Sequence, residues 1–127
     1  LPEKAVVLGN GGAAKAVSHA LRQKDVEVVI CARHPARGER PWSEIGDAVR
    51  DCGLLINATP LGMAGKAAFS DLLFLKTMPK NAIVYDLVYN PRQTKLLQEA
   101  EMLCHPTIEG FALLKSQAEL AFTIFTT

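Results

Sequence analysis

The sequence predicts an α/β fold in which helices cover both faces of a doubly wound parallel sheet. Short apolar runs alternate with segments of helical periodicity along most of the chain, which is typical of a parallel α/β sheet. The apolar runs lack a regular alternation of polar residues, as expected of strands that are buried on both faces. A glycine-rich turn also lies between the first apolar run and the first helical segment.

The predicted strands are short runs rich in Val, Ile, Leu and Ala. They span Ala5–Leu8, Glu27–Cys31, Leu54–Asn57, Ala82–Leu87 and, with a weaker pattern, Cys104–Ile108. Pro106 confines the last of these to an edge of the sheet, because proline cannot donate a backbone hydrogen bond. The predicted helices span Gly12–Lys24, Ser43–Arg50, Ser70–Lys76, Arg92–Leu103 and Phe111–Phe125. Ser43 is the expected N-cap of the second helix.

The turn has the sequence Gly9-Asn10-Gly11-Gly12-Ala13-Ala14 and leads directly into the first helix. A strand, a glycine turn and a helix in this order are the context of a dinucleotide-binding fingerprint. Gly9 permits a tight turn, Gly11 lets the backbone approach a pyrophosphate, and Ala14 allows close packing of helix and strand. The helix N-terminus offers N–H groups and a partial positive charge to phosphates. We therefore favour a dinucleotide site over a plain turn, and a Rossmann-like sheet.

Composition sets further limits on the class of protein. The chain has 127 residues, 49% of them hydrophobic, and a net charge of +1, which fits one globular domain. These values indicate neither a nucleic-acid partner nor a membrane partner. Three widely spaced cysteines (Cys31, Cys52 and Cys104) suggest reduced thiols in a cytoplasmic protein, and three scattered histidines predict no metal site. The chain starts at Leu1 without a methionine, so we expect a fragment or an excised domain.

The residues after the second strand indicate which cofactor binds. An NAD site usually places an acidic residue there, but the sequence reads Cys31-Ala32-Arg33-His34. Arg33 and Arg37 instead offer guanidinium groups that suit a 2′-phosphate. A solvated, arginine-rich loop is the alternative interpretation. Together with the glycine turn, the arginines favour NADP.

Longer motifs carry a family resemblance. They are Gly9 to Val17, Asn57-Ala58-Thr59-Pro60-Leu61-Gly62-Met63, Asp86-Leu87-Val88-Tyr89-Asn90-Pro91 with Thr94, and Gly110 followed by Leu114 and Gln117-Ala118. In this order they resemble the cofactor-binding domain of the shikimate dehydrogenase family and its quinate relatives, over essentially the whole chain. The resemblance implies NADP-dependent interconversion of 3-dehydroshikimate and shikimate, in aromatic amino acid biosynthesis.

The resemblance also implies roles for individual residues. The pyrophosphate would be held by Gly9, Asn10, Gly11, Gly12 and Ala13. Arg33 and Arg37 would contact the 2′-phosphate, and Leu87 and Gly110 would lie near the nicotinamide. Tyr89 and Gln117 would reach a small-molecule substrate, shikimate or a relative. Ala32 and His34 stand where the family usually has polar Asn and Thr, so we expect a reduced affinity for NADP.

No residue of this chain is assigned a catalytic role. The family's catalytic lysine and aspartate belong to an N-terminal substrate domain, which we expect to be absent from residues 1–127. Asp86 follows a strand on the correct edge of the sheet, but we favour the interpretation that it braces a neighbouring loop. Lys66 is interpreted as solvated and His105 as a surface residue. Gln117 is the one polar residue on a broad apolar arc of the last helix, which favours a helix that faces a missing domain.

Two functions from different classes follow. The chain is the cofactor-binding domain of a shikimate dehydrogenase-like enzyme and is inactive alone, or it is a stand-alone NADP-binding sensor or scaffold that catalyses nothing. The related NADP domain of glutamyl-tRNA reductase is a third candidate, which the ending from Gly110 to Gln117 disfavours. The sequence distinguishes neither shikimate from quinate nor one oligomeric state from another.

Overall fold

A computed structural model describes residues 2–110 and contains one six-stranded sheet in which every pairing of neighbouring strands is parallel. The strands are β1 (Lys4–Leu8), β2 (Glu27–Ala32), β3 (Arg40–Pro41), β4 (Leu54–Asn57), β5 (Ile83–Asp86) and β6 (Thr107–Glu109). Their order across the sheet is β3-β2-β1-β4-β5-β6. This is the strand order of a Rossmann fold, as the sequence predicts.

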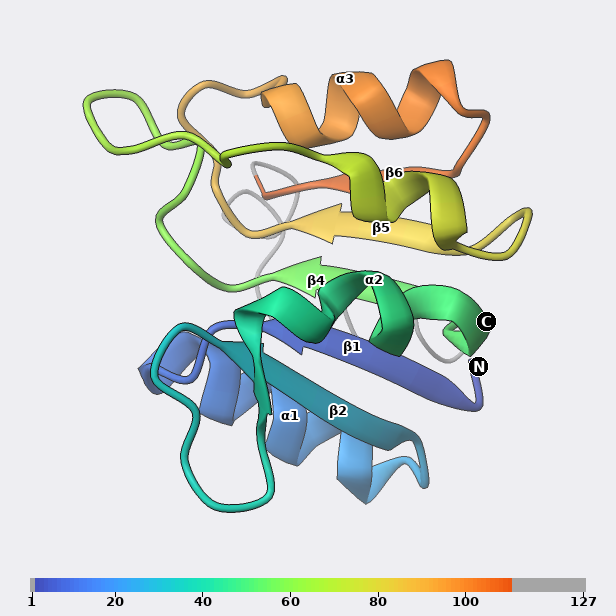
Figure 1. Ribbon diagram of the computed structural model, residues 1–127. Coiled ribbons are helices and arrows are strands. Elements are labelled where there is room, and N and C mark those ends of the chain that lie inside the picture. Colours follow the sequence, from blue (N-terminus) through green and yellow to red (C-terminus); the bar gives the residue numbers. More distant parts are fainter. Residues whose placement is uncertain (1, 111–127) are drawn as a thin grey trace.

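The strand order reverses between β1 and β4, in the middle of the sheet (Figure 1). Leu8 at the end of β1 is in register with Asn57 at the end of β4, and Asn57 is in register with Asp86 at the end of β5. Three loops therefore leave the same edge of the sheet side by side. In open α/β sheets, ligands bind in the crevice at such a switch point.

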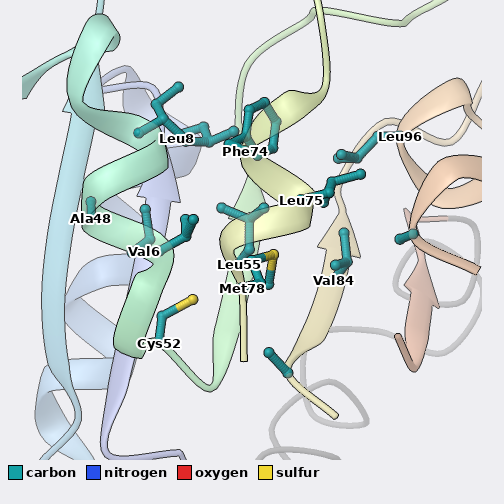
Figure 2. Packing of buried hydrophobic residues seen from close by; sticks show 14 of the residues in the cluster. Val6, Leu8, Ala48, Cys52, Leu55, Phe74, Leu75, Met78, Val84 and Leu96 are labelled. Atoms are coloured by element: carbon teal, nitrogen blue, oxygen red, sulfur yellow. The ribbon is translucent and has the colours of Figure 1, made fainter. Parts of the chain in front are cut away.

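Helices cover both faces of the sheet. The α-helices are α1 (Gly12–Gln23), α2 (Ile45–Ala48) and α3 (Lys95–Met102), and the 3₁₀ segments are η1 (Trp42–Glu44), η2 (Val49–Asp51) and η3 (Leu73–Thr77). Helix α1 lies on one face, and α2 lies on the other (Figure 1). Successive residues of β1 serve opposite faces: Ala5 and Val7 pack with α1, whereas Val6 and Leu8 pack with α2, η3 and α3 (Figure 2).

The structure differs from the sequence prediction in several boundaries. The helix predicted over residues 43–50 is a short α-helix flanked by two 3₁₀ segments, and Ser43 does not cap it. The two-residue strand β3 has no counterpart in the prediction. Helix α3 begins at Lys95 rather than Arg92, because the side chain of Thr94 caps it. Strand β6 is an edge strand, as Pro106 predicts. The predicted helix Phe111–Phe125 lies outside the described residues.

Three further expectations concern cysteines, membranes and metals. All three cysteines are free, and burial raises the pKa of the Cys31 and Cys52 thiols to about 11. Among residues 2–110, no helix is both long enough and apolar enough to span a bilayer. The same part of the chain contains no group of three or more His, Cys, Asp or Glu residues that could hold a metal ion.

The core predicts the cost of truncating a central side chain. Leu55 lies in β4 and is fully buried between β1, β5, α2 and η3. Leu55→Ala should lower the free energy of unfolding by about 2–5 kcal/mol, measured by urea denaturation, because it leaves a cavity in the core. Leu73→Ala is the control, since 62% of Leu73 is exposed. A cost at Leu73 equal to that at Leu55 would contradict this packing.

Candidate functional site

The turn after β1 closely approaches the loop after β4. Gly9 has a φ of +102°, a left-handed conformation that strongly favours glycine. A Cβ atom on Gly9 would lie 2.9 Å from Cγ2 of Thr59 and 3.2 Å from the carbonyl oxygen of Ala58. The Gly9 N–H donates to the carbonyl oxygen of Cys31 at 2.8 Å, so the turn is also joined to β2. The positive φ and the crowding at the Cβ position explain why glycine occupies this position.

The space at the Cβ positions of Gly11 and Gly12 is free, whereas the same space at Gly9 is occupied. A Cβ atom on either would meet no other atom within 4 Å, and both residues are exposed. Gly11 is the N-cap of α1, no side chain caps the helix, and its first turn contains no acidic residue. The N–H groups of the first turn, including that of Ala13, are therefore not blocked by a carboxylate or hydroxyl of the chain. An anion could approach this helix end directly.

A cavity of about 280 Å³ opens beside this turn. Its lining comes from the turn, the end of β2 and the residues that follow it, η1 and the loop after β4, and includes Gly9, Asn10, Gly11, Arg33, His34 and Trp42. The Arg33 guanidinium carbon lies 5.9 Å from the centre of the Trp42 ring, and Trp42 stacks on Phe69. Arg37 is exposed and does not line the cavity. The structure thus places Arg33 at the cavity, but not Arg37.

The side chain of Asn10 contacts the loop after β2. Its amide nitrogen donates to the carbonyl oxygen of His34 at 3.0 Å and to Oε1 of Glu39 at 2.9 Å. The same Glu39 oxygen accepts from the Ala36 N–H at 2.8 Å. Sequence reasoning did not single out Glu39. The only available signal was an acidic residue close to Arg33 and Arg37, because its partner Asn10 is 29 residues away in the sequence.

Asn57 and Thr59 shape the loop after β4. The Asn57 amide nitrogen donates to the Leu61 carbonyl oxygen at 3.2 Å and to the Asp86 carboxylate at 3.0 Å. Its side-chain oxygen accepts from the Thr59 N–H and from the Thr59 hydroxyl, the latter at 2.6 Å. Because Asn57 is fully buried, each of these polar atoms needs a partner inside the protein. The loop therefore has a fixed shape where it meets Gly9.

Asp86 is the buried centre of this region. Its carboxylate accepts from Asn57, from the Val88 N–H at 3.0 Å and from the Thr94 hydroxyl at 2.7 Å. Burial raises the pKa of Asp86, and the hydrogen bonds from Thr94, Val88 and Asn57 act in the opposite direction. The prediction that Asp86 braces a neighbouring loop is confirmed. With three donors around it and no exposed surface, the carboxylate is not placed to exchange a proton with a substrate.

The opposite side of the switch point contains Leu87 and Gly110. A Cβ atom on Gly110 would lie 2.5 Å from the Leu87 carbonyl oxygen and 2.8 Å from that of Asp86, so only glycine fits there. The Leu87 N–H donates to the Asn57 carbonyl oxygen at 3.1 Å. Tyr89 follows in the loop after β5 and is 47% exposed. Gln117 lies outside the described residues. The structure therefore brings Leu87 and Gly110 into contact.

His105 and Lys66 are both predicted from the sequence to lie at the surface, but only Lys66 does so in the structure. His105 is buried rather than exposed, and its Nδ1 lies 3.0 Å from the Ala82 carbonyl oxygen, so the surface prediction is wrong. The reason is the return of the chain from α3 to β6, which brings this residue against the start of β5. Lys66 is exposed, as expected.

Comparison with known proteins shows which proteins the chain is similar to. The chain is 38% identical over 130 residues to the NADP(+) shikimate dehydrogenase of Gluconobacter oxydans, covering 94% of this chain and 47% of that protein. The structure matches that of Thermus thermophilus shikimate 5-dehydrogenase in complex with NADP(H) and shikimate, at 33% identity and a TM-score of 0.75, covering 96% of this chain and 48% of the other.

A second solved structure extends the similarity to a related enzyme. It is quinate dehydrogenase from Corynebacterium glutamicum in complex with NAD, at 28% identity and a TM-score of 0.76, covering 98% of this chain and 50% of the other. No protein-family model matches the chain. The chain spans about half the length of the curated relatives that it matches.

The strand order and these similarities define the class of protein. The sheet, the glycine turn and the switch point are those of an α/β dinucleotide-binding domain, and the matched relatives are shikimate and quinate dehydrogenases. The chain belongs to the shikimate dehydrogenase family.

The bracing of Asp86 predicts a stability effect at Thr94. Thr94→Val keeps the shape of the side chain but removes both the donor to Asp86 and the acceptor that caps α3. The free energy of unfolding should fall by about 1–3 kcal/mol, measured by urea denaturation. Thr107→Val is the matched control, because Thr107 bonds Glu101 in an exposed setting, and we expect a change below about 0.5 kcal/mol. Equal effects at both positions would count against the bracing role.

Proposed function

We propose that this chain is the NADP-binding domain of a shikimate dehydrogenase-like oxidoreductase, which interconverts 3-dehydroshikimate and shikimate. The observation that carries the proposal is the contrast within the glycine turn. Gly9 is crowded against Thr59 and Ala58, whereas Gly11 and Gly12 are open at an uncapped helix end. A pyrophosphate needs both a rigid turn and an accessible row of N–H groups.

The residues of this chain would bind and orient the cofactor. The backbone of residues 9–13 would hold the pyrophosphate, and the side chain of Asn10 would hold the neighbouring loop rather than the phosphate itself. Arg33 would grip the 2′-phosphate from the wall of the cavity, with Trp42 beneath its guanidinium group. Arg37 is a weaker candidate for this contact, because it lies outside the cavity lining.

The nicotinamide would lie at the other side of the switch point, near Leu87 and Gly110. When bound, the cofactor supplies or accepts a hydride at the carbon that carries the substrate oxygen. The close approach of Gly110 to the Leu87 carbonyl oxygen leaves no room for a side chain between these two segments. Tyr89 is exposed close by, which suits contact with a substrate hydroxyl or carboxylate. Gln117 stays a candidate for the same contact.

The acid/base residues of the reaction would come from another domain. Proton transfer requires a group within hydrogen-bond reach of the reacting oxygen. Asp86 is the one acidic residue buried at this edge among residues 2–110, and its carboxylate is already engaged by three donors. The chain spans about half of its relatives, which supports a separate substrate domain in the complete protein. The same engagement of Asp86 would suit a non-catalytic NADP sensor or scaffold, which is the second candidate.

Cofactor preference tests the assignment of the 2′-phosphate site. The 127-residue chain should bind NADP more tightly than NAD in isothermal titration calorimetry, because Arg33 lines the cavity without an acidic partner in the described ion pairs. Arg33→Ala should weaken NADP binding by roughly 1.5–3 kcal/mol and leave NAD binding unchanged. Equal or stronger binding of NAD by the unchanged chain would rule out the assignment.

A second arginine serves as the control for this experiment. Arg22 lies in the last turn of α1, at the opposite end of the helix from the glycine turn, and is exposed. Arg22→Ala removes the same charge without touching the cavity, so both affinities should stay within about twofold of the original values, a margin of roughly 0.4 kcal/mol.

The absence of a catalytic pair from the described residues predicts the activity of the chain alone. The purified 127-residue chain, supplied with NADP and either shikimate or quinate, should form NADPH no faster than a mixture without protein, as followed by absorbance at about 340 nm. Turnover should appear only with the full-length protein. Measurable turnover by the chain alone would refute the proposal that the acid/base residues lie elsewhere.

A further inference from the structure

Glu39 is the acidic residue bonded directly to the glycine turn. Its Oε1 atom receives two hydrogen bonds, from the Asn10 amide at 2.9 Å and from the Ala36 N–H at 2.8 Å. We propose that Glu39 determines the preference of this site between the 2′-phosphorylated and the unphosphorylated dinucleotide. This inference rests on the function proposed above and assigns a role to a residue that the glycine and arginine motifs do not include.

The first argument is the position of the carboxylate. Asn10 lines the cavity and also donates to the His34 carbonyl oxygen, so one amide group joins the turn, the end of β2 and Glu39. Glu39 therefore closes the loop of residues 33–39 onto the turn before any ligand binds. Glu39 does not itself line the cavity, but its hydrogen-bond partner Asn10 lines it together with Arg33.

The second argument is the charge itself. Hydrogen bonds from the Ala36 amide and from Asn10 lower the pKa of Glu39, so the carboxylate is ionised at neutral pH. Within residues 2–110, Glu39 takes part in none of the ion pairs. The neighbouring Arg40 is already paired with Glu44 and Asp47. Lys15 attracts this carboxylate only from beyond ion-pair distance, so no contacting cation among the described residues compensates the charge of Glu39.

The consequence follows from the two cofactors. An unphosphorylated ribose presents a 2′-hydroxyl, which can donate a hydrogen bond to a carboxylate. A 2′-phosphate carries negative charge and is repelled by the same carboxylate. Arg33 attracts the phosphate and Glu39 opposes it, so the balance between the two side chains sets the preference. One relative binds NADP(H) and another binds NAD on the same fold.

Glu39→Gln tests the charge while keeping an acceptor oxygen for Ala36 and Asn10. Calorimetric titration of the 127-residue chain should show the affinity for NADP rising about threefold to tenfold. The affinity for NAD should rise less than that for NADP, or fall, because the pyrophosphate is common to both cofactors and the 2′-phosphate belongs to NADP alone. The gain for NADP should shrink at high ionic strength, since screening weakens charge interactions but would not alter a loss of loop geometry.

Glu27→Gln is the matched control. Glu27 is exposed at the start of β2, so it lies at the opposite edge of the sheet and changes the net charge equally. We expect no change in the ratio of the two affinities there. If Glu39→Gln leaves the ratio unchanged, or if Glu27→Gln shifts it as much, the role of Glu39 is refuted while the proposed function stands. If the unchanged chain binds neither cofactor, the proposed function fails, and this inference fails with it.

Discussion

The hydrogen bond between Asn57 and Asp86 joins two neighbouring strands at the point where both end. Both side chains are fully buried, and their remaining polar atoms are satisfied by Thr59, Leu61, Val88 and Thr94. Removing either partner would leave a buried polar group unpaired, which costs more than the bond itself contributes. The loops after β4 and β5 and the start of α3 therefore have their positions fixed together.

The glycine turn depends on this arrangement. Gly9 lies against Thr59 and Ala58, so the shape of the loop after β4 defines the space that the turn occupies. The Ala58 N–H also donates to the Leu8 carbonyl oxygen at 2.9 Å, which continues the hydrogen bonding from β4 to β1. Preorganised binding groups need support of this kind, because a loosely held turn would lose affinity to ordering. The support comes from residues that do not themselves touch the proposed pyrophosphate site.

Sequence patterns predicted the elements that depend on local chemistry. The strand Leu54–Asn57 was predicted with its observed bounds, because its apolar run is short and clearly bounded. Strand β3 was missed, since Arg40 and Pro41 carry neither apolar character nor periodicity. The bracing role of Asp86 followed from its place at a strand end. The pairing of Asn10 with Glu39 could not be predicted, because it depends on how a loop returns to a turn 29 residues away.

The stacking of Arg33 on Trp42 has a consequence for how this molecule can be observed. Trp42 is the single tryptophan of the chain, and it lines the cavity beside the glycine turn. Its ring also rests on Phe69, from the loop between β4 and η3. The indole absorption and emission of the whole protein therefore originate at the adenosine side of the proposed site. The chain carries an intrinsic optical label, located where a cofactor would change its surroundings.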